Sequence, residues 1–176
     1  PVNGSTSFED PLSGADLTVT NTIITSTTVP AIYGIRLHGL IQKTVLVDHN
    51  DFDFINYGVV VSGQGIQSQY TATYNNYNFL TYYANLPANV FFGTVPVPST
   101  AGLVGSVNCS NNNLVATGSF RGIQLFTINN AIVNNNTIFN SLGSQSEEFA
   151  GVFLGGNCSN YSIQSNTVHG PGNTYP

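Results

Sequence analysis

Charge is the first thing that this sequence lacks. Only 6% of its 176 residues are charged, and three Lys or Arg face eight Asp or Glu, for a net charge of −5. An ordinary soluble domain contains about 25% charged residues. Nucleic acids and anionic membrane surfaces are both bound through clusters of Lys and Arg. The composition therefore predicts that neither is a partner of this protein.

Long apolar runs and helix patterns are missing as well. No apolar run approaches the roughly 18 residues that a membrane span needs. No segment places apolar residues at i, i+3, i+4 and i+7 between capping residues. What recurs is short alternation, as in Val45–Val47, Ile123–Leu125 and Tyr161–Ile163, which is typical of strands. We expect an all-β protein without a membrane span, forming a single domain over residues 1–176.

Neutral polar residues stand in place of the missing charge, mainly Asn, Ser, Thr, Gly and Tyr. Such a surface is typical of proteins outside the cell, so we expect an extracellular or cell-surface location. The start at Pro1 predicts a processed chain or a piece of a longer one. Five Asn-x-Ser/Thr sequons, about as many as chance gives in this composition, are candidate glycosylation sites: Asn3, Asn108, Asn135, Asn157 and Asn160.

One motif recurs: an apolar residue, two free positions, Asn, one free position and a second apolar residue. VDHNDF, VNNNTI and IQSNTV fit it, ATYNNY and TVTNTI fit loosely, and VATGSF has Gly in place of Asn. Because Gly and Asn both tolerate a left-handed backbone, we predict a left-handed corner there rather than a need for amide chemistry. The apolar residue two positions later should enter the core. The predicted corner residues are Asn21, Asn50, Asn75, Gly118, Asn136 and Asn166.

A Gly followed by an apolar residue precedes the corners by 14 to 17 residues, whereas the return from a corner to the next such Gly takes 4 to 27. A nearly constant half and a variable half are typical of solenoid coils, whose packed strands are fixed and whose loops tolerate insertions. The strand-opening glycines are Gly34, Gly58, Gly102, Gly122 and Gly151.

These glycine openers and Asn-x-apolar corners resemble those of right-handed parallel β-helix proteins, the pectate-lyase-like and phage-tailspike-like group. The resemblance implies about six coils over roughly residues 17–170, flexible ends at 1–14 and 170–176, and one long aromatic loop insertion. Coils stack at about 4.8 Å, so equivalent Asn side chains can hydrogen-bond along the stack as a ladder. The group includes lyases, hydrolases, adhesins and structural proteins, so the fold alone does not decide the function.

Most of the charge lies in the second predicted coil. In an enzyme, these carboxylates would serve acid–base chemistry or calcium binding, and the Arg would bind a sugar acid. Neighbouring coils carry almost no charge to converge on such a cleft, so we favour a solvated coil with surface ion pairs. We assign no catalytic, metal or cofactor site to this cluster of Arg36, His38, Lys43, Asp48, His49, Asp51 and Asp53.

The longest return, from Asn75 to Gly102, is rich in aromatic residues and Pro. Three interpretations stay open for it: a loop folded on its own coil, an interface with a neighbouring subunit, and a platform that stacks on sugar rings. The aromatic residues concerned are Tyr82, Tyr83, Phe91 and Phe92.

The two cysteines, Cys109 and Cys158, each follow a strand-opening Gly by seven residues. This spacing predicts equivalent positions two coils apart, about 9.6 Å at the strand spacing. A disulfide needs Cα atoms within roughly 7 Å, so we expect two free thiols.

The ends of such a solenoid expose unpaired strand edges, and the sequence has no amphipathic helix to cover them. A head-to-tail contact between copies does not close, so it builds a filament or sheath. We therefore predict an extracellular structural protein, a filament, sheath or surface-layer subunit that binds copies of itself and has no enzymatic activity. The alternatives are a fragment of a carbohydrate-binding or carbohydrate-cleaving β-helix protein, and an adhesin.

Overall fold

A computed structural model describes most of the strands and corners of the chain. The described residues are 6–9, 16–26, 31–38, 44–53, 55–62, 69–78, 88–93, 104–116, 120–126, 128–140, 149–155 and 158–170. All regular structure among them is β-strand, and every strand pairing is parallel. The prediction of an all-β protein is confirmed for the described part of the chain.

The strands form three parallel sheets of six strands each. Sheet A contains β1 (Thr6–Glu9), β4 (Ala31–His38), β7 (Ile55–Ser62), β10 (Ala88–Gly93), β13 (Phe120–Phe126) and β16 (Phe149–Gly155). Sheet B contains β2 (Leu17–Thr20), β5 (Thr44–Asp48), β8 (Gln69–Thr73), β11 (Val104–Ser110), β14 (Ile128–Asn134) and β17 (Tyr161–Gln164). Sheet C contains β3 (Ile23–Thr25), β6 (Asp51–Asp53), β9 (Asn76–Asn78), β12 (Asn113–Ala116), β15 (Thr137–Asn140) and β18 (Thr167–His169).

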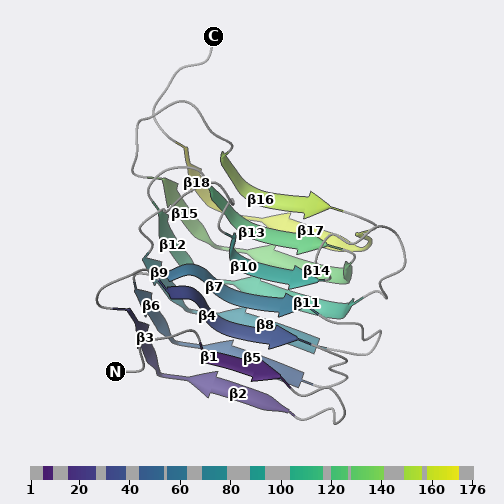
Figure 1. Cartoon of the computed structure of the whole chain (residues 1–176). Helices are drawn as coiled ribbons and strands as arrows, with labels where there is room; N and C mark the ends of the chain where they lie inside the picture. Colours follow the sequence, from purple (N-terminus) through teal and green to yellow (C-terminus); the bar gives the residue numbers. More distant parts are fainter. Residues whose placement is uncertain are drawn as a thin grey trace.

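The chain enters sheets A, B and C in turn and then returns to sheet A, so three consecutive strands make one pass (Figure 1). There are six passes. β1 to β3 lie at one end of the stack and β16 to β18 at the other, and each strand pairs with the strand three places later in the chain.

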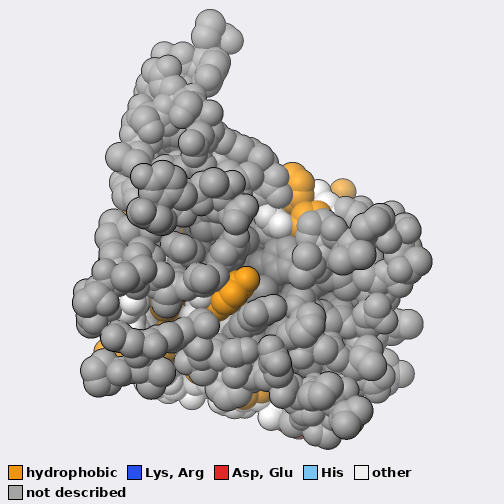
Figure 2. Space-filling view, viewed as in Figure 1, with side chains coloured by type: hydrophobic (Ala, Val, Ile, Leu, Met, Phe, Trp, Pro, Cys, Tyr) orange, Lys and Arg blue, Asp and Glu red, His pale blue; other side chains and the backbone are white. Residues whose placement is uncertain are grey.

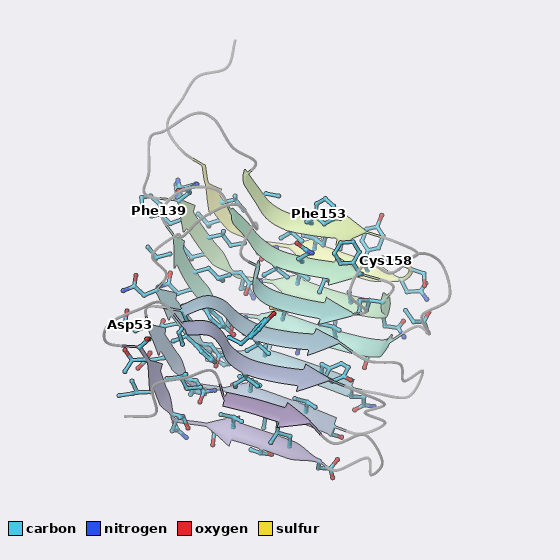
Figure 3. The ribbon with its side chains drawn as sticks, in the orientation of Figure 1. Asp53, Phe139, Phe153 and Cys158 are labelled. Atoms are coloured by element: carbon cyan, nitrogen blue, oxygen red, sulfur yellow. The ribbon has the colours of Figure 1, made fainter. Side chains whose placement is uncertain are left out.

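Side chains alternate between the core and the outside along each strand, as a period of two requires (Figure 3). In β6, for example, Phe52 is buried while Asp51 and Asp53 are exposed. The buried side chains of the three sheets form one hydrophobic cluster. Because the register is parallel, like positions stack into columns, and the rings of Phe52 and Tyr77 stack at 4.7 Å. Full burial of each such side chain contributes roughly 1.5–3 kcal/mol.

Charge is scarce on the outside of the stack, as the composition requires. On the face shown in Figure 2, the described side chains are almost all apolar or neutral polar. Where carboxylates occur on sheet C, the next pass supplies an amide: Asn76 Nδ2 donates to Asp51 at 2.8 Å, and Asn78 Nδ2 donates to Asp53 at 3.2 Å.

The glycines of sheet A lie where the core is narrowest. A Cβ added to Gly34 would lie 2.7 Å from the ring of Phe52, and one added to Gly122 would lie 2.5 Å from the carbonyl oxygen of Gly151 and 2.9 Å from Ile138. Sheet A therefore approaches the inner column of sheet C too closely for a side chain. Each of these glycines faces the core residue that lies two positions after a column Asn, so the distance along the chain from the glycine to the corner is nearly constant.

The aromatic run at Phe91 and Phe92 is a strand, which corrects the prediction of one long aromatic loop. Both residues lie in β10, which pairs with β7 and β13 through Val90. The strand escaped detection because Asn89 stands opposite Gly122 and so interrupts the glycine pattern. Tyr82, Tyr83 and Gly102 lie outside the described residues.

The first pass begins earlier than predicted. β1 lies within residues 1–14, which we expected to be a flexible end, and it pairs with β4 from Thr6 to Glu9. Residues 1–5, 10–14 and 171–176 lie outside the described part of the chain.

Adding one methyl group at Gly122 tests the close approach of sheets A and C. We expect Gly122→Ala to lower the free energy of unfolding by about 1–3 kcal/mol, because the Cβ overpacks against backbone that has little room to shift. Thr137→Ala, at an exposed position of β15, is the control and should change it by less than about 0.5 kcal/mol. Urea unfolding followed by circular dichroism measures both, and equal effects would contradict the packing argument.

Candidate functional site: the asparagine column and the sixth pass

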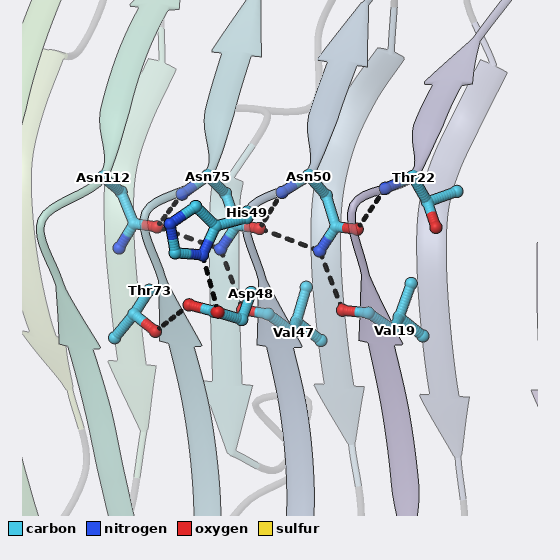
Figure 4. Close-up of polar contacts among 9 residues, drawn as sticks. All are labelled: Val19, Thr22, Val47, Asp48, His49, Asn50, Thr73, Asn75 and Asn112. Atoms are coloured by element: carbon cyan, nitrogen blue, oxygen red, sulfur yellow. Dashed lines mark hydrogen bonds and ion pairs between the residues drawn. The ribbon is translucent and has the colours of Figure 1, made fainter.

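A column of asparagine side chains runs along the corner between sheets B and C. Within it, the Nδ2 of each Asn donates to the Oδ1 of the Asn in the next pass at 2.9–3.1 Å. The same Nδ2 donates to a strand carbonyl of the previous pass at 2.7–2.9 Å, as from Asn50 to Val19 (Figure 4). The column consists of Asn50, Asn75, Asn112, Asn136 and Asn166.

The backbone of the column is tied in the same direction. The N–H of each column residue donates to the Oδ1 of the next at 2.9–3.0 Å, starting with Thr22 donating to Asn50. The Oδ1 atoms of Asn75, Asn112 and Asn136 therefore each accept two hydrogen bonds, and their Nδ2 atoms each donate to the next Oδ1 and to a carbonyl of the previous pass. Asn50, Asn75, Asn112 and Asn136 are almost fully buried, so these amides are satisfied entirely by neighbouring passes.

The left-handed residue is the one before the column residue, which corrects the predicted role of the Asn. Its φ lies between 51° and 59° in all six passes. Three of the six left-handed residues are not Asn, so the column position is kept for its amide and not for its backbone: Asn21, His49, Tyr74, Asn111, Asn135 and Ser165.

Two predicted members are replaced. Asn21 is the exposed left-handed residue of the first pass, and Thr22 occupies the column position. Gly118 lies outside the described residues, and Asn112 takes the column position in that pass. The run Asn111–Asn113 concealed Asn112, because it offers three adjacent candidates for one position.

The column makes a sharp prediction about neighbouring asparagines. Asn75→Ala removes two donated bonds and leaves the buried N–H and Nδ2 of Asn50 without their acceptor, so we expect a loss of roughly 2–4 kcal/mol in unfolding free energy. Asn76→Ala removes only an exposed bond to Asp51 and should cost less than about 1 kcal/mol. Urea titration of the two variants compares them, and losses of similar size would refute the column's role.

Of the predicted charged cluster, the described side chains bring together Asp48 and His49, whose Oδ2 and Nδ1 lie 2.7 Å apart. Arg36 and His38 lie in β4 of sheet A, Asp51 and Asp53 lie in sheet C, and Lys43 falls outside the described residues. Among the described residues, no three His, Cys, Asp or Glu side chains lie close enough to hold a metal ion. In the same part of the chain, no helix is long and apolar enough to cross a membrane.

Asp48 illustrates how a charge is held on this surface. Partial burial opposes its ionisation, but hydrogen bonds from Thr73 and His49 and the charge of His49 outweigh it, so the pKa of Asp48 lies below its ordinary value. The His49 ring in turn stacks on Tyr74 at 4.9 Å. These contacts lie on the solvent-exposed side of the corner, opposite the buried asparagine column, and stabilise the turn.

The candidate glycosylation sites differ in exposure. Asn135 and Asn160 are exposed left-handed residues at corners. Asn108 is half-buried in β11, and its Oδ1 accepts the hydroxyl of Ser110 at 2.7 Å. Asn3 and Asn157 lie outside the described residues. Glycosylation at all five stays a prediction.

Both cysteines are free, as expected, but they are not equivalent. Cys109 is buried in β11 opposite Ala72, whereas Cys158 is half-buried before β17, with its Sγ 3.2 Å from the carbonyl oxygen of Gly155. The spacing from glycine misled us, since β10 and not Gly102 supplies the sheet A strand of that pass. Burial raises the pKa of the Cys109 thiol well above its ordinary value.

Thiol labelling should separate the two cysteines. In native protein, iodoacetamide at pH 8 should modify Cys158 at least tenfold faster than Cys109. The reagent reacts only with a thiolate that it can reach, and Cys109 is buried and has a raised pKa. In urea without reductant, both should be modified. Peptide mass spectrometry gives both rates; Cys158→Ser should abolish the fast phase, and failure to label either thiol in urea would show a disulfide.

No described residue covers the inner face of the sixth pass. Tyr161, Ile163 and Val168 belong to inward-facing columns, yet they are 57%, 39% and 45% exposed. The residues beneath them in the fifth pass, Ala131, Val133 and Ile138, are at most 2% exposed. Among the described residues, the N–H of Asn166 has no acceptor, although the N–H of every earlier column residue has one. Among the described residues, the inner side chains of the sixth pass and the N–H of Asn166 therefore lack the cover that the earlier passes have.

Comparison with known protein families, curated proteins and solved structures gave no match to this chain. The function is therefore argued from the geometry alone.

Proposed function

We propose that the six passes are coils of a right-handed parallel β-helix, and that the protein is an extracellular structural subunit whose end coils stack on those of further copies. The observation that carries this proposal is the exposed inner face of the sixth pass. Three large apolar side chains there occupy positions whose equivalents in passes two to five are at most 2% exposed. Covering them with another pass would add the same burial that stabilises the internal ones.

The two ends of the stack are chemically complementary. Between passes, the carbonyl oxygen of each column residue accepts a hydrogen bond from the residue just after the column residue of the next pass. For example, the N–H of Thr167 donates to the carbonyl oxygen of Asn136 at 2.8 Å. At the sixth pass, the carbonyl and N–H of Asn166 point onward to where a seventh pass would lie. At the first pass, the hydroxyl of Thr22 donates to Thr20 and keeps lone pairs to accept from such an N–H. The first pass of a second copy can therefore continue the stack.

Apolar surface and low charge favour a second copy of this chain as the occupant. Leu17, Val19 and Ile24 of the first pass are only partly buried, and they would meet the exposed side chains of the sixth pass. Of the six strands at the two ends, only β1 contains a Lys, Arg, Asp or Glu, and that residue is Glu9. Ends with so little charge repel one another weakly, and a head-to-tail contact between them extends without closing.

Blocking one end at a time tests the proposal. We expect the unmodified chain to form concentration-dependent linear oligomers, and Val168→Lys and Ile24→Lys each to raise the dissociation constant at least tenfold, because each buries an unpaired charge in the contact. A mixture of the two variants keeps one intact end of each kind and should form dimers but nothing longer. Sedimentation velocity measures all of these species.

Phe139→Lys is the matched control, since Phe139 is 42% exposed on the outer face of sheet C. It should leave association unchanged. Circular dichroism first establishes that all three variants are folded. A strictly monomeric unmodified chain, or a mixture that forms no dimer, would refute end-to-end stacking.

A further inference from the structure

A shallow groove of about 420 Å³ lies across sheet B, and of its lining residues only Tyr161 also belongs to the end contact proposed above. It crosses the beginnings of β8, β11 and β14 and the turn before β17. Parallel register places its outward side chains in two rows. One row contains Gln69, Ser106, Asn130 and Asn160, and the other contains Thr71, Asn108, Ile132 and Ser162.

The polar side chains of the groove keep both donors and acceptors available. Asn130 uses its Nδ2 to donate to Gly105 at 3.3 Å, which leaves its Oδ1 as an acceptor. Asn108 uses its Oδ1 to accept from Ser110, which leaves its Nδ2 as a donor. The hydroxyls of Thr71 and Ser162 flank them and can do either. Such mixed capacity suits ligand hydroxyl groups, which also donate and accept.

Apolar surface alternates with these polar groups. Ile132 is 46% exposed in the middle of the groove, and Tyr161 is exposed at its end. None of the lining residues is Lys, Arg, His, Asp or Glu. A charged ligand would therefore be desolvated without a counter-charge, which is costly.

We propose that this groove binds a neutral, unbranched glycan whose chain runs across the strands. Amides and hydroxyls would bind the sugar hydroxyls, while Ile132 on the outer face would contact the apolar face of a ring. The rows repeat with the strand spacing of about 4.8 Å, which is close to the length of one pyranose residue, so one sugar can lie over each pass. The four strands of the groove thus match a segment of about four sugars.

An extended peptide fits this groove less well. Peptides that bind to sheets usually pair with the backbone of an edge strand. β8, β11 and β14 are internal strands, paired on both sides, so their backbone groups are already used. Only β17 lies at the edge of sheet B, and a peptide pairing with it would run along β17 instead of across the groove. Over the other three strands the groove offers only side chains, which is what a sugar needs and a peptide backbone does not.

Calorimetric titration with five defined hexasaccharides tests the proposal on the whole chain. The neutral probes are cellohexaose, laminarihexaose, xylohexaose and mannohexaose, and hexagalacturonate is the acidic one. We expect at least one neutral probe to bind with a Kd below about 1 mM, and hexagalacturonate to bind at least tenfold more weakly. Binding of no neutral probe, or equal binding of the acidic one, would overturn the proposal.

Substitutions place the binding in the groove. Asn130→Ala should weaken binding of the best neutral probe about three- to tenfold, the loss expected for one hydrogen bond, and Ile132→Ala should weaken it further. Asn113→Ala, an exposed Asn on the outer face of sheet C, is the matched control and should bind normally. If Asn130→Ala and Ile132→Ala, both shown to be folded, bind as tightly as the control, the groove is not the site. The Val168→Lys variant should still bind, so this test and that of end stacking fail independently.

Discussion

The structure depends on one side-chain amide repeated at one corner. Where the chain turns from sheet B to sheet C, the N–H of the column residue and a carbonyl three residues earlier have no strand partner. The Asn of the next pass meets both needs, because its Oδ1 accepts the N–H and its Nδ2 donates to the carbonyl. Asp could not donate, and a column of Asp would stack like charges at the strand spacing. The amide therefore holds the passes in register.

Turning and tying are separate tasks at this corner, carried by adjacent residues. The left-handed residue comes first and is exposed enough to vary in side chain, as His49, Tyr74 and Ser165 show. Each such conformation costs of order 1–3 kcal/mol for a residue other than Gly. The buried bonds of the following Asn offset this cost. Because the tie is buried and the turn is exposed, the residue at the turn differs between passes while the column residue is Asn throughout passes two to six.

Short-range patterns made much of this arrangement predictable. Alternation predicted the strands, and the Asn-x-apolar motif placed Phe52, Tyr77 and Ile138 in the core, where they are buried. The motif was wrong for Ile23, which is 73% exposed, because Thr22 and not Asn21 occupies the column position of the first pass. What the sequence hid was register over longer distances. Asn112 lay among identical neighbours, and β10 has Asn89 in the glycine position. The groove on sheet B was equally hidden, because its side chains come from four passes and form no local motif.

The shortage of charge follows from the same stacking. A parallel register stacks outer positions about 4.8 Å apart, so like charges in one column would repel one another by about 1 kcal/mol per exposed pair. Asp51 and Asp53 avoid this because Asn76 and Asn78 stand above them. Thr, Ser and Asn are the commonest residues at the other described outer positions of sheets B and C. A surface made neutral for the sake of stacking is also one that can approach an identical copy, or an uncharged sugar chain, without a penalty for stripping water from ions.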